Sequence, residues 1–163
     1  MVKKEMEMNE DEILDNESAE LRVYELGFHI DPELPVEEVK KAYHAMRELI
    51  AKKGTIVAEG EPEKIQLAYT ISRQETSGRR DFGSAYFCWI AYEAYAANHA
   101  EIIEAVGADT HFIRFIDLLT TKDATRHAVE MRELSRKVPE ERVKDTEEAL
   151  NVELDAALEH VAI

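Results

Sequence analysis

The stretch KIQLAYTISRQETSGRRDFGSAYFCWIAYE, residues 64–93, decides the fold. Its first third alternates apolar and more polar side chains over residues 65–71, which is typical of a strand with one apolar face. Residues 75–84 are rich in turn-forming residues. Residues 84–93 are apolar on both faces, which indicates a central strand. We therefore predict two strands in succession, joined by a turn with Arg79 and Arg80 at its exposed tip.

The residues on either side of this stretch add a strand and a helix before it and another pair after it. Tyr24, Leu26, Phe28 and Ile30 alternate as in a strand. A helical apolar pattern follows from residue 36 to the stop at Gly54, and the second strand has a bend or bulge at residues 60–62.

A shorter helix is predicted over residues 94–106, ended by Gly107, and the last strand over residues 111–119. The order strand, helix, strand, strand, helix, strand predicts an α+β, ferredoxin-like βαββαβ domain. Its four-stranded sheet would be antiparallel, with both helices on one face.

The predicted domain occupies residues 22–122 and has a flank on each side. Residues 1–21 form an acidic N-terminal arm without a sustained period. Residues 123–163 form a helical C-terminal extension, whose last part, residues 140–163, carries one apolar stripe. That stripe needs a surface, which is the domain itself, a partner helix or a second copy of the chain.

The formal net charge of −15 restricts the kinds of partner. Net charges of −6, −4 and −5 fall on residues 1–21, 22–122 and 123–163, so the middle segment is only mildly acidic. A phosphate-binding patch there has to be small, because nucleic-acid affinity rises with the number of phosphates that are neutralised. The sequence shows no apolar run long enough for a membrane span or signal peptide, and we expect a cytoplasmic protein.

From Arg80 onward, the segment RRDFGSAYF (residues 79–87) has the look of an RNA-reading octamer, which needs aromatic residues at its third and fifth positions. Phe82 fits the third position, but Ser84 occupies the fifth. We therefore interpret the segment as a hairpin tip that continues into a core strand. Arg79 and Arg80 either contact phosphate groups or form a solvated pair near acidic residues.

Four segments resemble the bacterial small-subunit ribosomal protein S6 family in order and spacing. They are RVYELGFHIDPEL (22–34), QLAYTIS (66–72), GSAYFCWI (83–90) and HFIRFI (111–116). The resemblance covers residues 22–122, and LAYTIS is its most specific piece. It implies a structural protein that binds the central domain of small-subunit ribosomal RNA together with ribosomal protein S18. No DNA, membrane or cofactor is expected as a partner.

The resemblance and the residue pattern together give the candidate RNA-binding residues. These are Arg22, Tyr24, Lys64, Arg79, Arg80 and Arg114. Arg114 is the first choice, because it would leave the sheet on the face opposite Tyr24 and Tyr69. Both tyrosines fall on the apolar phase of their strands and are predicted to pack in the core.

The chain departs from the family pattern at two places that bear on RNA. Lys64 is the one cation left ahead of Leu-Ala-Tyr, and Ile113 replaces an arginine of the last strand. A ferredoxin-like protein-interaction or small-molecule regulatory module without RNA binding is therefore the alternative function.

The sequence gives little support to an enzyme. No nucleophile motif, glycine-rich phosphate loop or metal-ligand spacing occurs among its six histidines, so no catalytic or metal-binding residue is expected. The single cysteine, Cys88, lies in an apolar run and is predicted to be a buried, inert thiol.

Overall fold

The structure is a computed structural model that describes residues 20–137. Its elements follow in the order β1 (Leu21–Ile30), α2 (Val36–Lys53), β2 (Thr55–Glu75), β3 (Gly78–Tyr95), α3 (Ala96–Ala108) and β4 (Phe112–Thr120). The predicted βαββαβ order is confirmed. A helix over residues 122–137 follows β4, which agrees with the helical C-terminal segment predicted from the sequence.

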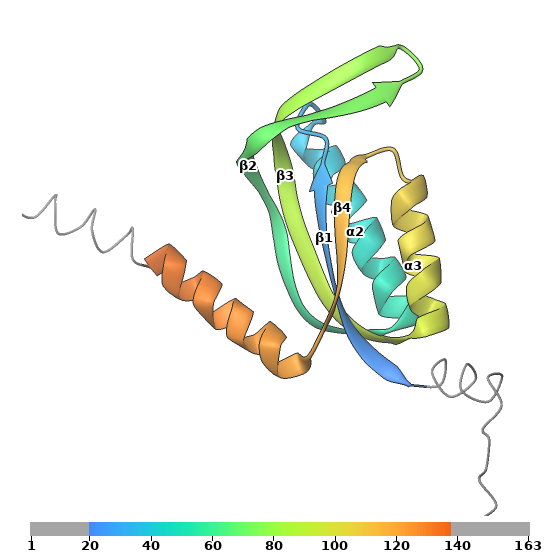
Figure 1. Cartoon of the computed structure of the whole chain (residues 1–163), viewed down its shortest axis with the longest axis vertical. Helices are drawn as coiled ribbons and strands as arrows, with labels where there is room; N and C mark the ends of the chain where they lie inside the picture. Colours follow the sequence, from blue (N-terminus) through green and yellow to red (C-terminus); the bar gives the residue numbers. More distant parts are fainter. Residues whose placement is uncertain (1–19, 138–163) are drawn as a thin grey trace, which may run out of the picture. The chain divides into compact units, whose positions relative to one another are not determined.

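The strands form one antiparallel sheet in the order β2-β3-β1-β4, and α2 and α3 cover one face of it (Figure 1). The prediction that residues 84–93 lie in a central strand is confirmed, because β3 pairs with both β1 and β2. β2 and β4 are the two edges of the sheet.

The core lies between the sheet and the two helices. It is built from alternate residues of β1 and β3 and from the apolar stripe of α2, with Ile102 and Val106 from α3. Tyr24 is buried in this core, as predicted. Cys88 is buried too, and burial raises the pKa of its thiol, so it is protonated and unreactive at neutral pH.

Two glycines are required by local geometry. A Cβ atom on Gly60 would lie 2.1 Å from Nε1 of Trp89, so only glycine lets the bulged part of β2 pack on that ring. The predicted bulge is confirmed by a register shift between Gly60 and Glu63. Gly78 has φ +123°, a conformation that side-chain-bearing residues rarely adopt, and it follows the hairpin turn.

The outer part of the β2–β3 hairpin differs from the prediction of a turn-rich segment over residues 75–84. Strand pairing continues to the contact between Glu75 and Gly78, so the turn itself is only residues 76–77. A register shift between Gln66 and Ile71 bends the hairpin, and its outer part crosses above the ends of β1 and β4 (Figure 1). We call residues 71–82 the arm.

α3 ends at Ala108, one residue beyond the predicted stop at Gly107. The chain divides into two compact units between Thr125 and Arg126. Of the predicted acidic N-terminal segment (residues 1–21), residues 1–19 lie outside the described residues, and Leu21 belongs to β1. The predicted apolar stripe of residues 140–163 also lies outside the described residues. Within residues 20–137, no helix is both long and apolar enough to cross a membrane.

Candidate nucleic-acid interface

Arg114 lies on β4 and forms a contact pair with Tyr69 of β2. The Arg114 guanidinium donates a hydrogen bond to the Tyr69 hydroxyl and lies 5.5 Å from the centre of its ring. The Tyr69 side chain is 61% exposed, so the prediction that it packs in the core is wrong. Arg114 is exposed as well, and the pair presents a cation beside an accessible aromatic ring.

The strand register places further side chains in line with Arg114. Arg114 pairs with His29, His29 pairs with Phe87, and Phe87 pairs with Glu63. Directly paired residues of an antiparallel sheet share a face. This cross-strand row (Arg114, His29, Phe87 and Glu63) therefore lies on the sheet face opposite the helices. The prediction that Arg114 emerges on the face opposite Tyr24 is confirmed.

His29 and Phe87 form the middle of the cross-strand row. Their ring centres are 5.5 Å apart, and both side chains are half-buried. Burial, and secondarily the positive charge of Arg114, lower the pKa of His29 below its usual 6.5. The ring is therefore neutral at pH 7, and it offers π-surface and a hydrogen-bonding nitrogen rather than a charge.

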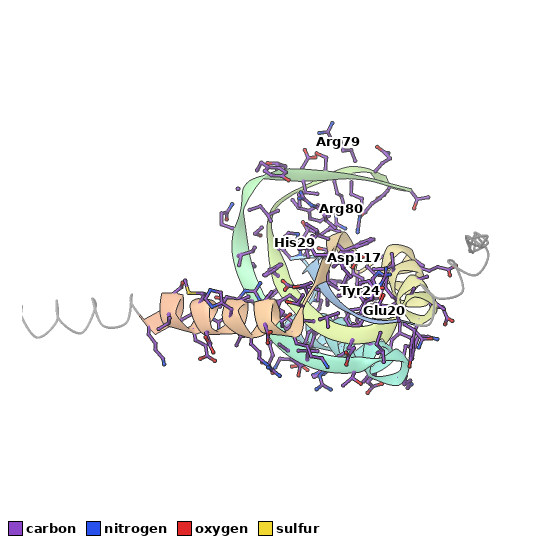
Figure 2. The ribbon with its side chains drawn as sticks, turned by 60° about the horizontal axis from the view of Figure 1, so that its bottom comes forward. Glu20, Tyr24, His29, Arg79, Arg80 and Asp117 are labelled. Carbon is purple, nitrogen blue, oxygen red and sulfur yellow. The ribbon has the colours of Figure 1, made fainter. Side chains whose placement is uncertain are left out.

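Arg79 and Arg80 are neighbours in sequence but point to opposite sides of the arm. Arg79 lies on the outer side, and Arg80 points toward the domain (Figure 2). Arg79 is exposed and contacts the carboxylate of Asp81 at 3.1 Å and the hydroxyl of Ser72 at 2.8 Å. Its position allows a phosphate contact in place of Asp81.

Arg80 is the centre of an ion-pair cluster that joins the arm to the β1–α2 loop. It lies 2.9 Å from a carboxylate oxygen of Asp31, 2.7 Å from Glu33 and 3.0 Å from Glu75. Its guanidinium also lies 4.7 Å from the ring centre of the buried Phe82. Three carboxylates surround one guanidinium, so Arg80 is part of the scaffold rather than a site for phosphate.

Tyr24 is also used internally. Its ring stacks on His99 with centres 3.6 Å apart and planes 7° apart. Nε2 of His99 lies 2.9 Å from a carboxylate oxygen of Asp117, and Nδ1 lies 2.8 Å from the Tyr92 hydroxyl, both within hydrogen-bond distance. This buried contact gives Tyr24 a role in holding α3 and β4 against β1, and it leaves little ring surface for a nucleotide.

Arg22 and Lys64 lie apart from the cross-strand row. Arg22 is near the start of β1, at the opposite end from His29, and contacts Glu20 at 3.4 Å. Lys64 is exposed on the helix-covered side of β2, where it pairs with Tyr86 and lies 5.7 Å from its ring centre. The structure therefore gathers Arg114, but none of the other five candidate residues, into the row.

Comparison with known proteins identifies the family. The sequence profile described as ribosomal protein S6 matches residues 23–118, which is more than half of the chain. The chain belongs to the ribosomal protein S6 family. Members of the S6 family are small-subunit ribosomal proteins with a structural role.

A solved S6 structure has the same fold. The 30S ribosomal protein S6 from Thermotoga maritima matches with a TM-score of 0.52 and 18% sequence identity, covering 73% of this chain and 98% of its own. No curated protein sequence matches the chain significantly. The matched S6 region includes the cross-strand row and the arm, whereas Arg22 and the helix over residues 122–137 lie outside it.

The sequence did not indicate the positions of two residues of the S6 domain. Tyr69 is predicted to pack in the core, but it lies within the register shift between Gln66 and Ile71, which interrupts the pairing of β2 with β3. Arg73 was not singled out, yet it pairs with Glu75 and donates to the carbonyl of Thr110 at 3.0 Å. Arg73 pairs directly with Arg80 across the hairpin, so both side chains lie on the inner side of the arm. The alternation of side chains along the two strands would have indicated this position.

Within residues 20–137, the S6 domain shows no group of three histidine, cysteine or acidic side chains that could hold a metal ion.

Proposed function

We propose that this S6-family protein is a structural constituent of the small ribosomal subunit that binds small-subunit ribosomal RNA together with ribosomal protein S18. The proposal includes the central domain of that RNA as the binding site and the cytoplasmic ribosome as the location. Family membership supports the ribosomal role. The exposed Arg114–Tyr69 pair at the end of the cross-strand row is the observation that supports RNA contact.

The chemistry of this pair fits RNA. A guanidinium forms charge-assisted hydrogen bonds with phosphate oxygens, and an exposed aromatic ring stacks on an unpaired base. Half-buried His29 and Phe87 extend the aromatic surface next to Arg114. Arg79 and Lys64 are exposed and remain candidates for separate phosphate contacts. Arg80 and Tyr24 are assigned structural roles instead.

The acidic chain explains why a partner belongs in the proposal. With a formal net charge of −15, the protein is repelled by RNA at long range. Several described cations are also paired internally, as in the Arg47–Glu59 contact at 2.6 Å. A few local contacts therefore have to be supplemented by a cationic partner that shares the RNA site, and S18 is the partner that we propose.

The test is co-assembly of the purified full chain, S18 and a central-domain RNA fragment, followed by electrophoretic mobility shift. We expect a ternary complex that weakens as salt rises. Tyr69→Ala should lower the affinity about tenfold, because stacking on one base contributes about 1–3 kcal/mol.

The matched control is Tyr95→Ala, which removes a 43% exposed tyrosine at the start of α3 and should leave the affinity unchanged. Equal losses in the two variants would remove Tyr69 from the interface. If no salt-sensitive complex forms with RNA and S18, the alternative of a protein-interaction module without RNA binding is favoured.

A further inference from the structure

β4 combines an edge position with an exposed apolar surface. Its nine residues, FIRFIDLLT, form one edge of the sheet. Four of its large apolar side chains are exposed, with exposed fractions of 36% for Phe115, 54% for Ile116, 48% for Leu118 and 66% for Leu119. No other strand in residues 20–137 exposes as many large apolar side chains.

Within the described residues, one side of the β4 backbone has no strand paired with it. Its other side pairs with β1. An edge strand presents a row of N–H and C=O groups that can pair with a further strand. Proteins that avoid such pairing protect their edges with charged residues, proline or bulges.

The opposite edge of the sheet has these protective features, and β4 lacks most of them. β2 contains Pro62 between Glu61 and Glu63, and it has three register shifts along its pairing with β3. β4 has no proline, and its pairing with β1 is regular from Thr120 to Arg114. This contrast indicates that β4 is suited to accept a partner strand.

The two charged side chains of β4 are engaged by its own domain. Arg114 contacts Tyr69, and Asp117 lies within hydrogen-bond distance of His99, which is itself held by Tyr92. These contacts tie β4 to β2 and α3 of its own domain. A rigid, preformed edge reduces the ordering cost of binding.

Charge selects the occupant of this edge. Two copies of a chain with net charge −15 repel each other, which disfavours pairing of β4 with a second β4. A cationic segment is attracted by the same charge. We propose that the outer edge of β4 binds an extended, lysine- or arginine-bearing segment of a partner protein, which adds a fifth strand to the sheet and covers Ile116 and Leu118.

The segment pairs its backbone with β4, as in other cases of strand addition, and its apolar side chains lie beside Ile116 and Leu118. This inference deepens the proposed function and rests on it for one probe, S18, but the chemistry of the edge does not depend on RNA binding.

The experiment measures amide hydrogen exchange of the full chain with two separate probes, purified S18 and a synthetic nine-residue peptide of alternating valine and lysine. We expect exchange of the β4 amides to slow about tenfold or more when the probe is saturating, because paired amides are protected. A peptide of the same length in which proline replaces every third residue cannot pair regularly and is the negative control.

A matched pair of variants tests the surface itself. Ile116→Lys should weaken binding of the probe about tenfold, because it places a cation at the centre of the edge. Val36→Lys makes the same change at a 53% exposed site on α2, compared with 54% at Ile116, and should have less than about a twofold effect.

The outcomes separate this inference from the proposed function. Protection of β4 by S18, or by the peptide when S18 does not bind at all, supports the inference. In the second case the result rejects S18 as the partner in the proposed function but supports the binding site at the β4 edge. If S18 binds but protects β2 instead, or if neither probe protects β4, the inference is overturned. Protection of β4 that rises with protein concentration without a probe would identify a second copy and overturn the proposed occupant.

Discussion

The inner and outer sides of the arm use arginine in opposite ways. On the inner side, Arg80 is surrounded by Asp31, Glu33 and Glu75, and it holds the arm to the β1–α2 loop. On the outer side, Arg79 is exposed and makes only local contacts (Figure 2). The pleat of the strand places adjacent residues on opposite faces, so it decides which cations of the arm stabilise the fold and which face away from the domain. A count of cations along the chain therefore overestimates how many of them can serve the RNA contact that we propose.

The largest expected effect comes from removing the apolar centre of the inner side. Phe82 is buried between Arg73 and Arg80, whose guanidinium carbons lie 5.5 and 4.7 Å from its ring centre. Phe82→Ala should cost about 3 kcal/mol, because burial and packing of the ring are lost. Urea unfolding gives the global value, and amide exchange of residues 71–82 shows whether the arm detaches first. A cost below about 1 kcal/mol would mean that the arm is not packed on the domain.

The next effect separates the two arginines directly. Arg80→Ala leaves the buried carboxylate of Asp31 without its cation and should cost about 2 kcal/mol. Arg79→Ala changes an exposed pair and should cost less than about 0.5 kcal/mol. Urea unfolding of both variants is the measurement. Adding Asp31→Asn to Arg80→Ala should recover part of the loss, and equal costs for the two single variants would contradict the distinction.

Acid should weaken the inner side of the arm. Hydrogen bonding from Arg73, with the charges of Arg73 and Arg80, lowers the pKa of Glu75 from its usual 4.5. Because the folded pKa is depressed, the stabilisation is complete above about pH 4.5 and is lost as the pH falls through the folded pKa. Amide exchange or NMR spectra of the arm between about pH 6 and 3 should show this loss in the native protein. Glu75→Gln should remove it, and an unchanged profile in that variant would assign the effect to another carboxylate.

The smallest predicted effect lies on the cross-strand row. The pKa of His29 is below 6.5 because of burial and the nearby charge of Arg114. The folded state therefore disfavours the protonated ring, and this contribution to stability decreases as the pH falls below about 6.5. NMR titration should show the pKa of His29 rising in Arg114→Gln but not in Arg79→Gln. The same shift in both variants would place the two arginines at similar distances from His29.

Local patterns predicted the sheet and the helices, but not the arm. Alternation over residues 24–30 and the stop at Gly54 were sufficient for β1 and α2, because both depend on nearby residues. The position of Tyr69 depends on a register shift that reverses the apolar phase, and no periodicity within one strand reveals it. The role of Arg80 depends on Asp31, which is 49 residues away in the sequence. Such a contact is visible only in the folded chain.

The candidate site could be predicted from the sequence only in part, for the same reason. The sequence identified Arg114 as exposed on the correct face, because its neighbours Ile113 and Phe115 set the phase of β4. It could not indicate that His29, Phe87 and Glu63 continue the row, since that depends on the register of four strands. The exposed edge of β4 was missed for a similar reason: an apolar strand has the same pattern at the edge of a sheet as in its centre.

The central claim is that Arg114, and not the cations bound inside the fold, contacts ribosomal RNA. The direct measurement is the salt dependence of RNA affinity for the complex with S18, comparing Arg114→Gln with Arg47→Gln, a change of equal charge on α2. Each phosphate contact contributes about 0.9 to the slope of log affinity against log salt on duplex and about 0.7 on single strands. The account predicts that the slope becomes smaller by about one contact for Arg114→Gln and stays unchanged for Arg47→Gln. Equal slopes for the native protein and Arg114→Gln would contradict it.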